Sequence, residues 1–106
     1  MTPPRRGDVW LAQLDKVRPV IVLTRDPMGR FLHAVVVAPV TSIVRGVSTE
    51  VAVGPADGVR LASVANLDNV ALMARTRLLR RVGRARPRTM AALCGALAIA
   101  VGCEPL

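Results

Sequence analysis

The chain has 106 residues, which fits a single domain, and its 52 % hydrophobic content is enough to bury one core, which excludes an intrinsically disordered protein. The formal net charge of +8 and the pI of about 11.6 favour a polyanionic partner, with nucleic acid as the first candidate. The 2 % aromatic content argues against a non-specific single-strand binder, because such proteins stack bases on several aromatic rings.

In chain order, residues 1–6 are predicted to form a flexible arm, and a series of short strands follows. Trp10, Ala12 and Leu14 alternate along one face of the first strand. Residues 19–24 are apolar on both faces, as in a central strand. Strands are expected at residues 7–14, 19–24, 31–40, 48–53, 63–73 and 80–86.

A helix is expected to begin at Pro87 and to end at Gly102, because proline favours the first helical position and glycine the position after the last. Its predicted apolar face consists of Met90, Leu93, Leu97 and Val101. Several short strands followed by one helix predict a mainly β domain over residues 1–106, a small curved sheet or barrel capped by the helix.

The compartment is predicted to be the cytoplasm. No apolar segment follows the N-terminal residues, and the longest low-charge run, residues 90–103, is too short to span a bilayer. The two cysteines have neither disulfide-scaffold nor CxxC spacing, which is typical of a reducing environment.

Four short strings, in order and at compatible spacing, resemble the MazF/PemK family of bacterial toxins. They are RGDVW at residues 6–10, VRPVIVL at 17–23, VAPVTS at 37–42, and LLRRVGRA at 78–85 followed by Met90. The resemblance implies an SH3-like barrel with a C-terminal helix, assembled as a homodimer. It also implies a type II toxin that cleaves single-stranded RNA without metal or cofactor, neutralised by an acidic antitoxin of the MazE type or another kind.

The resemblance places the catalytic residues at Arg18 and Thr41. A guanidinium beside the scissile phosphate can neutralise its charge into the transition state, and a hydroxyl can donate a hydrogen bond to a phosphate oxygen. Without the resemblance, Arg18 would be interpreted as closing the turn before Pro19, and Thr41 with Ser42 as turning the chain after Pro39.

The implied reaction is attack of a ribose 2′-OH on its own 3′-phosphate, which leaves a 2′,3′-cyclic phosphate and a 5′-OH and requires no metal. The proton acceptor is unassigned. His33 is the only histidine and is expected to be structural within a strand. Asp8 and Asp15 are alternatives that nothing in the sequence places in a site.

Polar residues interrupt the apolar stretch over residues 63–73. Asn66, Asp68 and Asn69 are predicted to read base edges, or alternatively to solvate a sheet edge or form a side-chain turn. Lys16 and Ser42, which lie close in sequence to Arg18 and Thr41, are further predicted substrate contacts. Ala71 stands where the family has an arginine, so one expected phosphate contact is missing.

Two further features concern partners. The connection at residues 15–17 is shorter than the loop common in the family, which is expected to leave the RNA groove more open and leaves mRNA, tRNA and rRNA as alternative targets. On an ideal strand, Arg80, Arg84 and Arg86 share one face, where they would contact RNA phosphates or the acidic antitoxin, or simply be solvated.

Two alternatives of other classes remain at this point. A CcdB-like toxin has the same fold and inhibits DNA gyrase without being an enzyme, through an aromatic residue near its C-terminus that this chain lacks. A basic, SH3-like nucleic-acid-binding module would bind with a steep salt dependence and cleave nothing.

Overall fold

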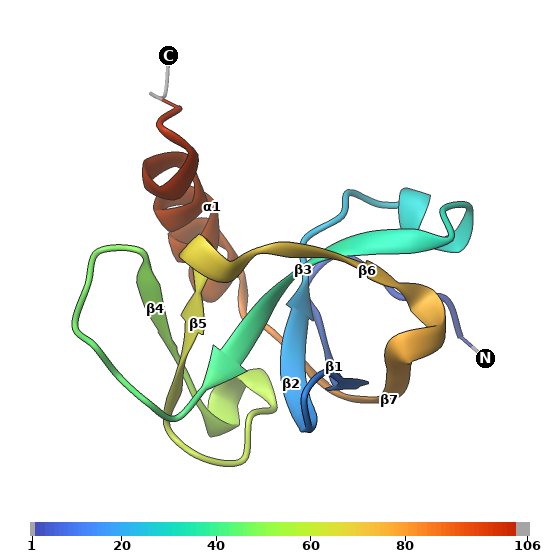
Figure 1. Ribbon diagram of the computed structural model, residues 1–106, viewed down its shortest axis with the longest axis horizontal. Coiled ribbons are helices and arrows are strands. Elements are labelled where there is room, and N and C mark those ends of the chain that lie inside the picture. Colours follow the sequence, from blue (N-terminus) through green and yellow to red (C-terminus); the bar gives the residue numbers. More distant parts are fainter. Residues whose placement is uncertain (1, 104–106) are drawn as a thin grey trace.

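The computed structural model describes residues 2–103, which form a seven-stranded antiparallel sheet and one long helix (Figure 1). The strands are β1 (Asp8–Gln13), β2 (Val17–Val22), β3 (Ala34–Thr41), β4 (Glu50–Val53), β5 (Ser63–Asn66), β6 (Ala71–Ala74) and β7 (Leu78–Arg84). The helix is α1 (Pro87–Val101). Short 3-10 turns are η1 (Met28–Arg30), η2 (Pro55–Asp57), η3 (Leu67–Asn69) and η4 (Arg75–Arg77).

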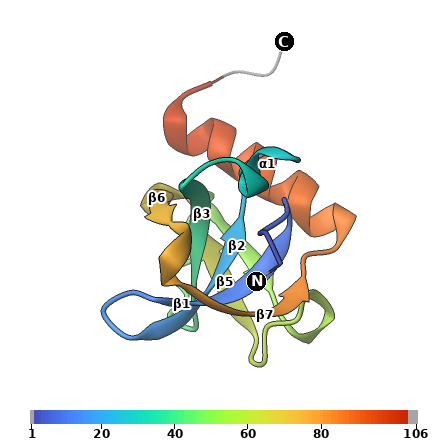
Figure 2. The same cartoon turned by 90° about the vertical axis from the view of Figure 1, so that its right-hand side faces the viewer.

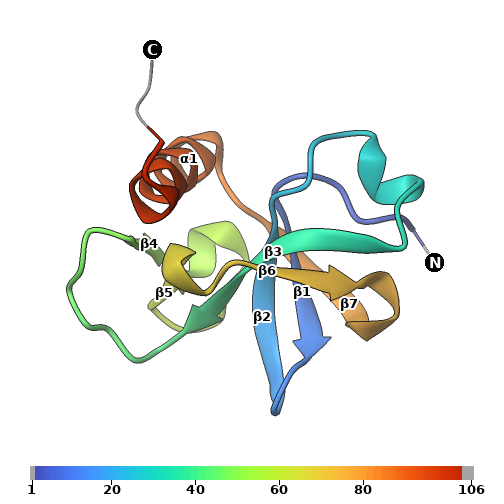
Figure 3. The same ribbon diagram turned by 45° about the horizontal axis from the view of Figure 1, so that its top comes forward.

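The strands pair in the order β4-β5-β3-β2-β1-β7, and β6 adds a second pairing to β3. Figure 3 shows β6 leading into η4, from which the chain returns as β7 beside β1. Within residues 2–103 the two ends of this order, β4 and β7, do not pair with each other. The mainly β fold with a C-terminal helix is confirmed, but the expected barrel is an open, curved sheet.

The central strands are buried on both faces, as predicted for residues 19–24. Val9 and Ile21 belong to one core, which β4, β5 and α1 cover, whereas Trp10 and Val20 belong to a second core beneath β6 and β7. Figure 2 shows α1 running across the top of the molecule. Because side chains alternate along a strand, consecutive residues of β1 and β2 point alternately into one core and into the other.

The stretch predicted as one strand over residues 63–73 is two strands separated by η3. The Asn66 side-chain oxygen accepts a hydrogen bond from the Asp68 N–H at 2.9 Å, which turns the chain. Before the turn, β5 pairs with the end of β3 at Val40. After it, β6 pairs with β3 from Val37 backwards. The side-chain turn that the sequence offered as one alternative for Asn66 and Asp68 is therefore present.

Helix α1 begins at Pro87 and ends before Gly102, which has φ +72°, as the sequence predicts. Leu93 and Ala96 are buried, and Met90 and Leu97 pack beside them. Val101, predicted on the apolar face, is 62 % exposed, because the covered stripe follows Ala96 and Ala100 at that end. Among the residues that the structure describes, no helix is long and apolar enough to cross a membrane.

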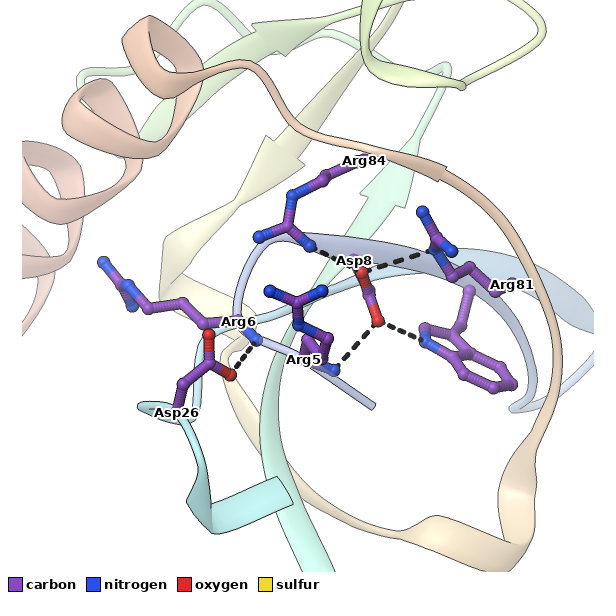
Figure 4. Close-up of polar contacts among 7 residues, drawn as sticks. Arg5, Arg6, Asp8, Asp26, Arg81 and Arg84 are labelled. Carbon is purple, nitrogen blue, oxygen red and sulfur yellow. Dashed lines mark hydrogen bonds and ion pairs between the residues drawn. The ribbon is translucent and has the colours of Figure 1, made fainter. Parts of the chain in front are cut away.

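The segment predicted as a flexible arm is packed from residue 4 onward. Pro4 is fully buried, and its carbonyl lies so close to Gly29 that a side chain at position 29 would collide with it. The Arg5 N–H donates to Asp8 at 2.9 Å and the Arg6 N–H to Asp26 at 2.9 Å (Figure 4). These contacts are long-range in part, so the local sequence did not reveal them.

Candidate active site

The two predicted catalytic residues come from neighbouring strands. β2 and β3 are antiparallel with Val20 opposite Pro39, so Arg18 lies two residues before this pair on β2 and Thr41 two residues after it on β3. Both residues line one cavity of about 390 Å³, here called the Arg18 cleft. Its walls also include Leu14, Asp15, Glu50, Asn66, Asn69 and Met73. A guanidinium and a hydroxyl from separate strands therefore face one space that is large enough for a nucleotide base.

Asp15 orients the Arg18 guanidinium. Arg18 Nε and Nη2 donate to the two carboxylate oxygens of Asp15 at 3.0 and 3.2 Å. This pairing uses one edge of the guanidinium and leaves its other N–H groups available for an anion. The hydrogen bond from Arg18, with one from the Lys16 N–H, lowers the pKa of Asp15 to about 2, and the same pairing raises the pKa of Arg18. Both groups stay charged throughout the neutral range.

The Thr41 hydroxyl is arranged as a donor. Its oxygen accepts a hydrogen bond from the Ile43 N–H at 3.1 Å. A hydroxyl whose oxygen already accepts one bond retains its proton for a second partner. Thr41 is thus suited to donate a hydrogen bond to a phosphate oxygen beside Arg18.

The remaining predicted site residues divide into three groups. Asn66 and Asn69 line the Arg18 cleft together with the two catalytic candidates. Lys16 and Ser42 line a separate hollow of about 210 Å³. Asp68 is not part of the lining of either space, and its carboxylate accepts a hydrogen bond from the Thr49 hydroxyl at 2.6 Å.

Sequence reasoning missed Glu50 and Arg45, which also line the Arg18 cleft. The Glu50 carboxylate accepts hydrogen bonds from the N–H groups of Arg45, Gly46 and Val47, with the shortest, from Gly46, at 2.8 Å. This contact fixes the loop that follows Thr41. The sequence gives only a weak signal for this role, because Glu50 is one charged residue at the start of a strand with alternating polar and apolar residues.

None of the three groups considered as proton acceptor fits that role. His33 is exposed, precedes β3 rather than lying within a strand, and lines a different hollow beside Arg75 and Thr76. Asp15 has a pKa of about 2, which makes it a poor base at neutral pH. The Asp8 side chain is 98 % buried. Asp8 begins β1, whereas Arg18 pairs with Ala12 near the other end of that strand.

Asp8 instead organises the arginines of β7. Its Oδ1 accepts from Arg84 Nη1 at 2.9 Å and lies 3.4 Å from Arg81 Nε, and Figure 4 shows both guanidinium groups directed toward the carboxylate. Its other oxygen accepts the Arg5 N–H and the Trp10 indole N–H, at 2.9 and 3.5 Å. Asp8 is therefore a structural carboxylate.

The prediction that Arg80, Arg84 and Arg86 share one face is wrong. The pairing of β1 with β7 shifts register twice, so that Arg81 and Arg84 pair with Trp10 and Asp8, whereas Arg80 pairs with Leu11. Arg86 lies beyond the strand and donates from Nε to Asp57 at 3.2 Å. Bulges change which residues share a face, and Gly83 at one of the two shifts is a local sign of such an irregularity.

Solved structures with a similar fold include a MazF toxin and a mycobacterial endoribonuclease. The Mycobacterium tuberculosis toxin MazF-mt6 superposes with a TM-score of 0.88 at 37 % identity, over 92 % of this chain and 99 % of that chain. An endoribonuclease in complex with its cognate antitoxin from a Mycobacterial species gives a TM-score of 0.87 at 30 % identity, over 97 % of this chain and 99 % of that one.

Sequence comparison leads to the same group. A family model for the PemK-like, MazF-like toxin of type II toxin–antitoxin systems matches residues 5–101. The probable endoribonuclease MazF5 of M. tuberculosis is 39 % identical over 104 residues, which cover 95 % of each chain. The endoribonuclease MazF3 of the same species is 43 % identical over 75 residues, 71 % of this chain and 73 % of that protein. The chain belongs to the PemK-like, MazF-like toxin family, and its activity class is endoribonuclease.

Proposed function

We propose that the chain is the toxin of a type II toxin–antitoxin pair and that it cleaves single-stranded RNA at short sequence motifs without a metal ion. The observation that carries this proposal is that Arg18 and Thr41, from two different strands, line one cleft. Family membership supports the reaction class. The relatives are named endoribonucleases, which favours an enzyme over a gyrase inhibitor or a simple nucleic-acid-binding module.

The proposed reaction proceeds at the phosphate that Arg18 and Thr41 contact. The ribose 2′-oxygen attacks phosphorus and loses its proton, the bond from phosphorus to the 5′-oxygen breaks, and that oxygen is protonated. The products are a 2′,3′-cyclic phosphate and a 5′-OH. Arg18 neutralises the charge that grows on the phosphate oxygens, and Thr41 donates a hydrogen bond to one of them. The group that accepts the 2′-OH proton is not assigned.

The remaining site residues are proposed to hold the substrate. Asn69 and Asn66, which line the Arg18 cleft, read base edges in this proposal, because an amide both donates and accepts. Asn66 uses its oxygen in the turn of η3 and therefore contributes its NH2 group. Lys16 and Ser42 contact the RNA backbone in the neighbouring hollow. Asp68 supports the turn through Thr49 and retains Oδ1 for the RNA.

The proposed partners are single-stranded RNA, an acidic antitoxin and a second copy of the chain. The charge of +8 favours an acidic antitoxin, and a similar endoribonuclease has been solved with its own cognate antitoxin. A homodimer would cover large apolar side chains that are exposed here, such as Leu72 at 72 % and Ile99 at 58 % exposure. We propose the cytoplasm as the site of action, because cellular RNA is found there. A monomer mass in solution at micromolar concentration would contradict the dimer.

The activity is tested by incubating the purified protein with RNA in EDTA and sequencing the fragments that carry 5′-OH ends. Arg18→Lys keeps the charge but loses the planar fork, and we expect kcat to fall by about 100-fold or more. Thr41→Val is expected to lower kcat by about tenfold or more, since it removes one positioned donor. Arg25→Lys, at an exposed arginine that lines neither space, is the control.

The outcomes separate the alternatives. Retained cleavage in Arg18→Ala would defeat the site assignment, provided that its thermal melt matches the wild type. Gyrase-dependent DNA breaks without RNA cleavage would select the gyrase inhibitor. Salt-sensitive RNA binding without scission would select the binding module.

A further inference from the structure

A second hollow lies on the other side of the two catalytic candidates. It has a volume of about 210 Å³ and is here called the Arg60 hollow. Arg18, Val40 and Thr41 line both this hollow and the Arg18 cleft, so they form the ridge between the two spaces. The remaining walls come from Lys16 and the first residues of β2, from Ser42, and from residues between 59 and 63, which lead into β5. A chain that crosses the ridge would therefore enter one space on each side of it.

The two spaces differ in charge. The Arg18 cleft contains the carboxylates of Asp15 and Glu50. The Arg60 hollow contains Lys16 and Arg60, and among its described lining residues there is no carboxylate. Because like charges repel and the hollow is uniformly cationic, a phosphate is favoured in the hollow over the cleft.

The walls of the hollow also suit the rest of a nucleotide. Leu61 is 65 % exposed and offers an apolar surface beside Arg60, and Val59 forms a buried floor at 3 % exposure. The Ser63 hydroxyl donates to the Leu61 carbonyl at 2.9 Å, which holds that segment in place. The hollow thus combines cations with an apolar wall, as a sugar-phosphate group requires.

We propose that the Arg60 hollow is a second nucleotide subsite, which binds the nucleotide across the scissile phosphate from the one held in the Arg18 cleft. Arg60, with Lys16, contacts the phosphate next to the scissile one, and Leu61 packs against the ribose or base. The base-reading polar groups belong to the cleft, and the backbone-binding cations belong to the hollow. This inference rests on the proposed ribonuclease function.

The first test uses an oligoribonucleotide that contains the motif identified from the 5′-OH ends. We expect Arg60→Gln to raise KM by about tenfold with kcat changed less than about twofold, because a contact made equally in the ground and transition states affects binding alone. Arg25→Gln removes the same charge from an exposed position outside both spaces, and we expect it to change KM by no more than about twofold. Matching thermal melts of both variants establish that each one folds.

The second test locates the contact on the RNA. A neutral methylphosphonate replaces the phosphate on one side of the scissile bond or on the other. In one of these two substrates the wild type loses affinity, and in that same substrate Arg60→Gln causes no further loss. In the other substrate Arg60→Gln retains its full effect. This pattern assigns Arg60 to a single phosphate.

The subsite is overturned if the wild type cleaves RNA and Arg60→Gln behaves like Arg25→Gln. It is also overturned if KM is unchanged while Arg60→Gln weakens the dimer in sedimentation or weakens antitoxin binding, since the hollow would then belong to a protein interface. If the wild type does not cleave RNA at all, the proposed function fails and the subsite fails with it.

Discussion

The side chain of Arg18 illustrates how one neighbour orients a candidate catalytic group. Asp15 binds the Nε and Nη2 edge and has a pKa of about 2, so the pair remains ionised at every pH at which RNA cleavage is measured. The exposed carboxylate restrains an otherwise flexible side chain and directs its remaining N–H groups. It also adds negative charge to the cleft, which opposes RNA binding.

These two effects of Asp15 predict a split in the kinetic constants. Asp15→Ala frees the Arg18 guanidinium, and we expect kcat to fall by about five- to tenfold because positioning is lost. KM is expected to stay constant or decrease, because the cleft loses one negative charge. Steady-state cleavage of one oligoribonucleotide measures both constants. Asp26→Ala removes an equal charge elsewhere, and an unchanged kcat in Asp15→Ala would show that Asp15 does not orient Arg18.

At the scale of elements, Asp57 joins η2 to the start of α1. The helix has no side-chain cap from its own N-cap residue, Arg86. Asp57 stabilises the start of the helix instead. Its carboxylate accepts hydrogen bonds from the Arg86 N–H at 2.9 Å and from the Thr89 hydroxyl at 2.8 Å. The approach is possible because Gly58 and Gly83 face each other, with a Cβ on either placed 2.5 Å from the Cα of the other.

Asp57 therefore predicts a pH dependence of stability. Complete burial opposes its ionisation, but the hydrogen bonds from Arg86, Thr89 and Gly54 outweigh burial and lower the pKa of Asp57. A lowered folded-state pKa gives stability that is present above the unfolded value of about 3.9 and is lost as pH falls through the folded value. The wild type should lose this contribution as the pH drops below about 4.

Asp57→Asn is expected to lower the free energy of unfolding by about 2–4 kcal/mol at neutral pH, because Arg86 loses its buried partner. The difference from wild type should shrink in acid. Urea unfolding at pH 7 and pH 3 measures it, with Asp26→Asn as an exposed control. A difference that is equal at both pH values would contradict the role assigned to this carboxylate.

For the whole molecule, the burial of two carboxylates makes the surface more positive than the net charge alone implies. The chain has 15 basic and 7 acidic residues, and Asp8 and Asp57 are buried beneath arginines. The half-exposed guanidinium groups of Arg81, Arg84 and Arg86 cover them. Attraction of RNA is thus a property of the folded surface as well as of the net charge.

This surface predicts a marked salt dependence of RNA binding. For a non-cleavable oligonucleotide with a 2′-deoxyribose at the scissile position, log Kd should rise with log salt by about 0.7 for each phosphate contacted. Arg60→Gln should reduce that slope by about 0.7, the value for one phosphate contact. A slope close to zero, measured by titration between low and physiological salt, would show that phosphate contacts do not govern binding.

The sequence alone determined the approximate positions of the central strands, the beginning and end of α1, and the family to which the chain belongs. These features depend on local signals: alternation such as Trp10 and Ala12, Pro87 at a helix start, and Gly102 after its end. The candidate residues Arg18 and Thr41 were likewise marked by short strings within strands. Local patterns predict such features because neighbouring residues alone decide them.

Only the tertiary structure decided which distant residues meet. It set Arg18 and Thr41 on one ridge between two spaces, added Glu50 and Arg60 to the candidate site, and assigned Asp8 and Asp57 to structural arginine pairs. It also divided residues 63–73 into two strands and left the sheet open. These outcomes depend on register, bulges and side-chain partners far apart in the chain, which hydrophobic periodicity does not encode.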